Sequence, residues 1–295
     1  FVIADCLRFG RINKEVYLDD YRYAALKNLT RARFFAVQNL TREKQRFMNQ
    51  LFKKYSSMTQ EKVFSDTFST TALAVYESFE SAETLANMDL HQLTEFIMEK
   101  GKNRFPDPDS VAKAIQKAAR SSYRLPKTVN DSVNQVLSIS ISSMRAMESQ
   151  IKAFDKAIAE QMALIPNTLT SVNGIGPVYS AGIIAEIGDI NRFPNQASLA
   201  KYAGLVWSQH QSGDFEAQNT RLIHSGNRYL KYYLCEAALS LVRCDAEYCS
   251  FYHRKYHEVN KYQHKRALAL TARKLVRLVF RLLKDNCLYR APESK

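Results

Sequence analysis

The sequence contains few of the residues that interrupt helices. Only 9 glycines and 7 prolines occur among its 295 residues. A fold of many short strands needs turn residues at most of its connections, so this scarcity argues against such a fold and favours long helices. The chain also lacks any run of about 18 uncharged apolar residues, which argues against a membrane span. We therefore expect a mainly α-helical protein with no membrane partner.

Cysteine is sparse as well. Its five copies are odd in number and show no Cys-x-x-Cys spacing, which disfavours a disulfide framework and a structural zinc site. His253 and His257 lie one helical turn apart, but without a His-Glu-x-x-His pattern a polar helix surface is the preferred interpretation. The first residues, Phe-Val-Ile-Ala-Asp, show neither the basic region nor the cleavage site of a secretory signal. These features predict a cytoplasmic protein, and the start at Phe1 instead of Met leads us to expect a fragment or a processed product.

Positive charge is abundant and unevenly distributed. The formal net charge is +13, with +7 in residues 1–58, +9 in residues 201–295 and −3 in the middle. Clustered lysines and arginines gain free energy by releasing counterions from phosphates, so two basic ends favour a polyanionic partner such as DNA or RNA. Basic helices that are merely solvated remain the alternative.

Two long segments without glycine or proline predict two long helices. Residues 19–58 carry apolar side chains at three- and four-residue steps, interrupted by Arg33, and residues 128–164 carry a heptad-like apolar stripe. A helix of about 60 Å cannot bury its own apolar face, so it needs a partner helix. We expect the two to pair as long antiparallel coiled-coil-like helices, a stalk with residues 59–127 as a small helical insertion at its tip.

Within the insertion, three short amphipathic helices are expected over residues 81–88, 90–100 and 110–121. Asp89 and Asp109 are plausible N-terminal caps of the last two, because an Asp side chain accepts hydrogen bonds from the first free backbone N–H groups of a helix. No residue pattern in the insertion suggests chemistry.

The strongest local motif begins at Ile165. A short helix ending at Val172, the turn Asn173-Gly174-Ile175-Gly176 and a helix rich in small residues form a helix-hairpin-helix pattern. Gly174 and Gly176 permit a tight turn and let backbone N–H groups approach a phosphate, with Ile175 filling the space between the helices. Such a hairpin holds a nucleic-acid backbone without reading bases. An ordinary tight helical turn is the alternative.

A second candidate site follows this hairpin. Val206-Trp207 is a candidate short strand, and Ser212 before Gly213 is expected on a turn where its hydroxyl projects freely. A serine can attack a phosphodiester when cations neutralise the charge that develops on phosphorus. Potential cations lie downstream, and we assign nucleic-acid binding to Arg221, Asn227, Arg228 and Lys231 together with the two hairpin glycines. A Ser-Gly pair alone is weak support for a nucleophile.

These motifs together resemble the C-terminal domain of the IS110 family of insertion-sequence transposases. The resemblance rests on the runs that begin at Val172, Ala185, Leu199, Gln211 and Ser225, in family order and spacing over roughly residues 165–290. Residues 1–58, with Ile-Ala-Asp-Cys-Leu-Arg-Phe-Gly-Arg and Leu-Thr-Arg-Ala-Arg, look like the middle of these proteins.

The resemblance implies a two-part active site. A RuvC-like domain would supply four acidic residues that bind Mg²⁺, and residues 165–295 would form the transposase domain, in which Ser212 corresponds to the serine that attacks DNA. It also implies a structured guide RNA, and the long helices together with a four-strand reaction imply a homodimer or homotetramer. Residues 1–18 would be the remnant of the RuvC-like domain.

Two departures from the family pattern limit what the resemblance implies. The chain begins just after the motif that would carry the last two acidic residues, and Asp5 lies beyond that motif, so we expect no bound metal and little activity from this chain alone. The stretch Ile223-His224-Ser225-Gly226 replaces the Lys-Arg that many relatives carry before the glycine. A non-catalytic nucleic-acid-binding module is the alternative function, and a helical scaffold with incidental basic faces is a third.

Overall fold

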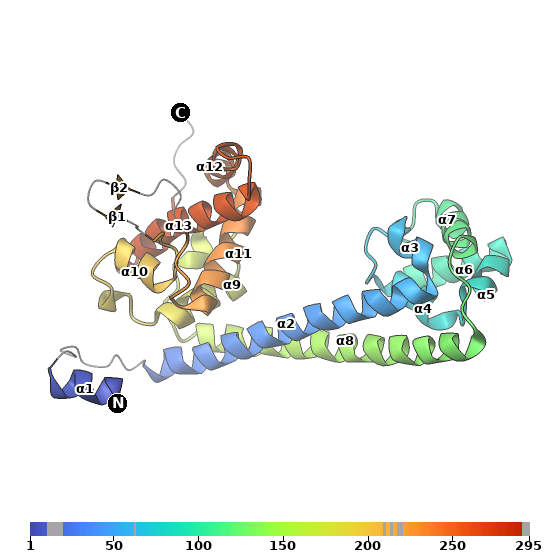
Figure 1. Ribbon diagram of the computed structural model, residues 1–295, viewed down its shortest axis with the longest axis horizontal. Helices are drawn as coiled ribbons and strands as arrows, with labels where there is room; N and C mark the ends of the chain where they lie inside the picture. The colour runs from blue at the N-terminus through green and yellow to red at the C-terminus, as the bar shows by residue number, and fades with distance from the viewer. Residues whose placement is uncertain (11–19, 62, 209–210, 213–214, 217–220, 291–295) are drawn as a thin grey trace. The chain divides into compact units, whose positions relative to one another are not determined.

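The computed structural model describes residues 1–295 except 11–19, 62, 209–210, 213–214, 217–220 and 291–295 (Figure 1). The described part is mainly helical, which confirms the predicted fold class. It divides into two compact units: residues 1–33 together with 154–295, and residues 34–153. No described helix combines the length and apolar character that crossing a bilayer requires.

The unit of residues 34–153 contains the second part of one long helix, five shorter helices and the first part of another long helix. They are α2 (Tyr21–Lys54), α3 (Ser56–Gln60), α4 (Thr70–Ser78), α5 (Ala82–Asn87), α6 (Leu90–Gly101), α7 (Pro108–Arg120) and α8 (Lys127–Met162). The helices over residues 81–88, 90–100 and 110–121 are confirmed to within two residues at each end, and α4 is an element that the sequence analysis did not single out.

Within this unit, α2 and α8 run side by side in opposite directions (Figure 1). Ser140 Oγ donates to Glu43 Oε1 at 2.6 Å, and Lys44 Nζ lies 3.4 Å from Glu148 Oε1. Apolar side chains of both helices meet those of the short helices in one core, which includes Phe47, Leu51, Tyr76, Leu85, Leu93, Ile97, Ile115, Leu137 and Ile141. Val136, placed on the apolar stripe from its spacing, is instead 44% exposed.

The N-terminal caps in the insertion differ in part from the prediction. Asp89 caps α6 as expected, since its carboxylate accepts from the N–H groups of His91 and Gln92 at 3.0 and 3.2 Å. The assignment of Asp109 was wrong, because Asp107 caps α7 by accepting from Ser110 N at 3.0 Å. Proline is favoured at the first helical position, so Pro108 places the cap one residue before it.

The unit of residues 1–33 and 154–295 contains α1 (Val2–Arg8), the first part of α2 and the end of α8. Its remaining elements are η1 (Leu169–Ser171), α9 (Pro177–Ile187), η2 (Ile190–Arg192), α10 (Gln196–Tyr202), β1 (Gln211–Ser212), β2 (Phe215–Glu216), α11 (Arg228–Cys244), α12 (Ala246–His257) and α13 (Gln263–Lys284).

Helix α11 contacts both α9 and α13 in the core of this unit (Figure 1). Gly182 of α9 faces the ring of Tyr233 so closely that a Cβ at that position would lie 2.4 Å from the ring. Tyr233 is buried, and its hydroxyl donates to the carbonyl of Thr30 in α2 at 2.8 Å. A single aromatic side chain therefore joins α9, α11 and the start of α2.

Arg33, which interrupts the apolar stripe of the first long helix, has an ion-pair partner in the same unit. Its Nε lies against Asp155 Oδ1 of α8, and the arginine side chain is only 17% exposed. A charge on an otherwise apolar helix face is tolerated when an opposite charge meets it there.

Candidate nucleic-acid interface

The predicted hairpin over residues 173–176 forms a tight turn between η1 and α9. Ile175 N donates to Val172 O at 2.9 Å, and the Ile175 side chain is buried in the core as expected. The element before the turn is one 3₁₀ turn, Leu169–Ser171, and not a longer helix ending at Val172. The second element, α9, begins at Pro177.

The two glycines of this turn differ in their surroundings. Gly174 has a φ of +105°, and a Cβ there would lie 3.3 Å from Cys244 Cβ and 3.4 Å from Leu241 Cα of α11. A Cβ at Gly176 would meet none of the described atoms within 4 Å, and Gly176 is exposed. Gly174 therefore serves the packing of the turn on α11, whereas the backbone at Gly176 is open to an approaching ligand.

Gly204 and Gly226 lie against each other at the two ends of the segment that carries Ser212. Gly204 has a φ of +68° and Gly226 a φ of +120°. A Cβ on Gly204 would lie 2.7 Å from the carbonyl oxygen of Ser225, and one on Gly226 would lie 2.6 Å from Gly204 N. Backbones can approach this closely only without side chains, so the two glycines fix where the segment leaves and rejoins the unit.

Between these glycines the chain forms an antiparallel hairpin. At its base, Trp207 bridges Leu222, with Ser208 N donating to Arg221 O at 2.8 Å and Ile223 N donating to Val206 O at 3.0 Å. The candidate strand at Val206-Trp207 is thus a single bridge. Farther out, β1 pairs with β2, and Ser212 lies opposite Phe215. The backbone of Ser212 is therefore on a hairpin, and its side chain lies outside the description, as do His210 and Gly213.

The structure separates the other predicted binding residues into groups. Arg221 is exposed at the base of the hairpin, while Arg228 and Lys231 lie in the first turn of α11. Gly174 packs against the opposite end of α11, and at 1.5 Å per residue the helix separates these ends by roughly 24 Å. These predicted contact residues therefore lie at both ends of one helix instead of in a single cluster.

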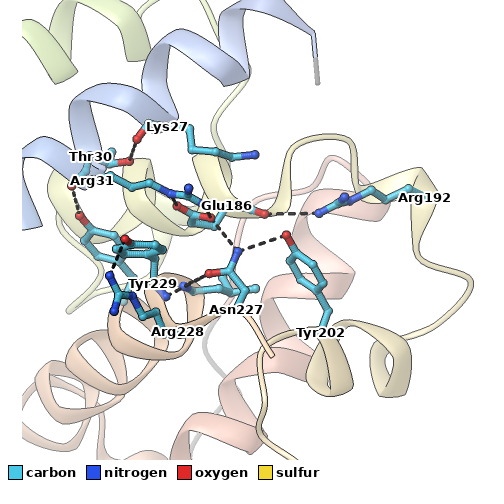
Figure 2. A network of polar contacts seen from close by, with 11 residues as sticks. Lys27, Thr30, Arg31, Glu186, Arg192, Tyr202, Asn227, Arg228 and Tyr229 are labelled. Carbon is cyan, nitrogen blue, oxygen red and sulfur yellow. Dashed lines mark hydrogen bonds and ion pairs between the residues drawn. The ribbon is translucent and has the colours of Figure 1, made fainter. Parts of the chain in front are cut away.

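Asn227 has internal partners on both sides of its amide. Its Oδ1 accepts from Tyr229 N and Leu230 N at 3.0 and 3.1 Å, so it caps α11. Its Nδ2 donates to Glu186 Oε2 at 2.7 Å and to the hydroxyl of Tyr202 at 3.1 Å (Figure 2). These contacts give Asn227 a structural role as the cap of α11 and a partner of Glu186. Its binding of nucleic acid stays a prediction.

Glu186 is the centre of this network (Figure 2). Its side chain has no exposed surface, and its carboxylate accepts from Arg31 Nε at 2.7 Å and Arg31 Nη2 at 2.8 Å as well as from Asn227. The hydrogen bonds to Glu186 raise the pKa of Arg31. The Arg31 guanidinium also lies 4.4 Å from the centre of the Tyr229 ring. The carboxylate thus ties α2 and α9 to the start of α11.

Glu186 was not predicted as a site residue from the sequence. Its only signal in the sequence is that it is the single charged residue in the apolar helix from Pro177 to Ile187, where a buried charge requires a partner. The partner Arg31 lies 155 residues away, so no local spacing identifies the pair.

A groove of about 1100 Å³ lies at the base of the hairpin. The hairpin contributes Trp207, Arg221 and Leu222, and residues 259–270, which lead into and begin α13, form the rest of its lining. Its lining includes four arginines or lysines, and among these described lining residues none is Asp or Glu. The groove is therefore cationic, and residues 259–270 had no assigned role from the sequence.

The described residues provide no metal centre. Among them, no group of three or more His, Cys, Asp or Glu side chains is placed to hold a metal ion. His253 and His257 lie on α12, and Tyr252 from the same helix bonds His264 Nδ1 at 2.7 Å.

Comparison with known proteins relates part of this unit to transposases. Residues 167–253 match the model of the Transposase IS116/IS110/IS902 family. This segment runs from η1 through α9, the hairpin and α11 into α12, so it contains Gly174, Ser212 and Arg221. The match covers less than a third of the chain.

Three curated proteins are similar to longer or overlapping segments. The IS110 43.6 kDa protein of Streptomyces coelicolor is 32% identical over 145 residues, 49% of this chain and 34% of that protein. The IS116 44.8 kDa protein of Streptomyces clavuligerus is 25% identical over 241 residues, 78% and 56% of the two chains. A probable family 20 transposase of Pseudomonas aeruginosa is 31% identical over 100 residues, 34% and 28%. The chain thus spans between about a quarter and just over half of these relatives, and residues 167–253 are the segment that matches the family model.

Proposed function

We propose that this chain, with its segment of an insertion-element transposase family, is part of a DNA transposase in which Ser212 attacks a DNA phosphodiester. The observation that carries the proposal is that the family match includes the hairpin bearing Ser212 and the exposed Arg221 at its base. Transposition as the activity is supported by the description of the matching family and the name of the Pseudomonas aeruginosa relative, while the other two relatives are named as insertion-element proteins. The role of the serine is what the resemblance to the IS110 family implies for Ser212.

In the proposed step, Ser212 Oγ forms a bond to phosphorus and the sugar oxygen on the opposite side of the phosphorus leaves. The serine proton passes to a base, and the leaving oxygen takes up a proton, so the DNA becomes linked to the protein as a phosphoserine ester. Negative charge develops on the phosphoryl oxygens during the attack, and a cation that reaches them would stabilise it; Arg221 at the base of the hairpin is the candidate.

Metal and guide RNA belong to the same proposal. Mg²⁺ would bind acidic side chains of a RuvC-like domain outside the described residues, which themselves offer no such cluster. A guide RNA would select the DNA sequence, and this agrees with contacts from this chain that suit phosphates instead of base edges. Strand exchange between two DNA duplexes would use a homodimer or homotetramer.

The decisive experiment uses the complete protein with its RNA and labelled DNA. A covalent protein–DNA adduct that survives denaturing electrophoresis is expected from the wild type and from Ser250→Ala, a matched change at an exposed serine of α12. Ser212→Ala is expected to abolish the adduct while binding of DNA is retained. If Ser212→Ala forms the adduct at the wild-type level, the nucleophile is another group. If no variant forms an adduct but all bind DNA, the non-catalytic binding module is the better description.

A further inference from the structure

The groove at the hairpin base combines unpaired positive charge with apolar surface. Arg221, Lys261 and Lys265 line it and are exposed, and none of the three takes part in an ion pair among the described residues. The fourth cation, Arg266, is held by Glu258 through two contacts of 3.0 Å. Three cations are thus available to phosphates.

Apolar side chains lie between these cations. Trp207, Leu222, Val259 and Leu270 contribute to the lining, and so does Tyr262, a residue that is 80% exposed. Tyr262 has a φ of +54°, which a bulky residue rarely adopts. Such a conformation persists only where the surrounding structure holds it, and it occurs preferentially at binding sites.

We infer that this groove binds an unpaired stretch of DNA strand, with a base stacked on Tyr262 and the flanking phosphates on Arg221, Lys261 and Lys265. Proteins that bind single strands combine aromatic platforms with a cationic groove in this way. A duplex keeps the faces of its bases inside its stack, so it would leave the apolar lining without a partner. An unpaired strand exposes its base faces to the apolar lining and its phosphates to the cations of the groove.

The inference deepens the proposed function and rests on it for the choice of DNA. Trp207 and Arg221 belong to the base of the hairpin whose outer strand carries Ser212. A DNA strand cut at Ser212 must be unpaired near the cut in order to change partners. The groove would hold such a strand while it is exchanged.

Trp207 provides a direct measurement, because it is the only tryptophan of the chain and lines the groove. Oligothymidylate of about 12 nucleotides is expected to quench its fluorescence on binding to the 295-residue chain, whereas a duplex of the same length is not. Loss of one stacking partner weakens binding of a single strand by roughly tenfold. That loss is expected for Tyr262→Asn, since asparagine tolerates a positive φ without offering a ring. Tyr262→Phe should retain the affinity, as should Tyr21→Ala, a control tyrosine that is also 80% exposed.

Salt dependence tests the phosphate contacts separately. Each phosphate contact to a single strand contributes about 0.7 to the slope of log affinity against log salt. Lys261→Ala and Lys265→Ala are each expected to reduce the slope by about that amount. Lys53→Ala, at an exposed lysine of the other unit, is expected to leave it unchanged.

Three results would overturn the inference: equal quenching by duplex and single strand, an affinity of Tyr262→Asn equal to that of Tyr21→Ala, or oligouridylate bound at least tenfold more tightly than oligothymidylate. Ser212→Ala separates this inference from the proposed function. If that variant still forms the DNA adduct but Tyr262 governs quenching, the proposed nucleophile fails and the groove stands. If the adduct depends on Ser212 but binding is independent of Tyr262, the proposed nucleophile stands and the groove inference fails.

Discussion

The ion pair between Glu186 and Arg31 offers the sharpest test of what holds the unit of residues 1–33 and 154–295 together. Glu186→Gln keeps the size of the side chain but removes its charge. The Glu186 carboxylate accepts two hydrogen bonds from Arg31 and one from Asn227. A glutamine amide would place a donor against one of these donors and leave the guanidinium without its counter-charge.

The size of the effect follows from the burial of the two groups. Removing one partner of a fully buried pair typically costs about 3 to 5 kcal/mol, because the remaining charge stays buried. Glu186 is fully buried but the Arg31 side chain is 37% exposed, so water partly solvates the remaining charge. We therefore expect Glu186→Gln to lower the free energy of unfolding by about 2 to 3 kcal/mol.

Urea denaturation followed by Trp207 fluorescence measures this change, since the only tryptophan lies in the same unit as Glu186. The matched control is Glu247→Gln in the same unit, which removes a half-exposed carboxylate paired with Lys274 at 2.6 Å. An exposed pair contributes no more than about 1 kcal/mol. Replacing both charges in Arg31→Met/Glu186→Leu should recover most of the loss. A Glu186→Gln variant within about 0.5 kcal/mol of the wild type, with an unchanged urea slope, would refute the reasoning.

The remaining predictions concern backbone conformation and one buried lysine. Gly226 has a φ of +120°, and a Cβ there would lie 2.6 Å from Gly204 N, so Gly226→Ala should lower the free energy of unfolding by about 2 to 3 kcal/mol in the same urea assay. An unchanged free energy would contradict the close approach of Gly204 and Gly226. Gly174→Ala should cost about 1 to 2 kcal/mol because of its φ of +105°, and Gly176→Ala no more than about 1. Burial lowers the pKa of Lys54 to about 8, below its unfolded value of about 10.4, so the unfolded chain binds more protons and stability should rise with pH. From pH 8 to 9.5 the free energy of unfolding, measured by circular dichroism, should rise by about 1 to 2 kcal/mol more in the wild type than in Lys54→Met. An equal rise in both proteins would refute this prediction.

The long helices were predictable because their signals are local. Neither α2 nor α8 contains glycine or proline, and each begins and ends within four residues of the predicted bounds. Asp89 was identified as a cap for the same reason, since a cap contacts N–H groups two and three residues away. Asp109 was misassigned as the cap because the helix was expected to begin at residue 110. Proline is favoured at the first helical position, so Pro108 marks an earlier start, with Asp107 as the cap.

The candidate site was only partly predictable. Ser212, Gly174 and Gly176 belong to short contiguous motifs, which a sequence displays directly. Asn227 was expected to contact nucleic acid, yet its amide is occupied by the helix N–H groups, Glu186 and Tyr202. A sequence names the donors and acceptors of a side chain but not the partners that fill them.

By itself the sequence determined the helical class, the two basic ends and the motifs shared with transposases, because each depends on composition or on residues within a few positions of one another. The tertiary structure alone decided that Glu186 meets Arg31, that Gly204 lies against Gly226 at the base of the hairpin, and that Tyr262 shares a groove with Trp207. These pairs are separated by 22 to 155 residues. Bringing such residues together depends on how whole helices pack, and packing is set by the combined burial of many side chains instead of by any local pattern.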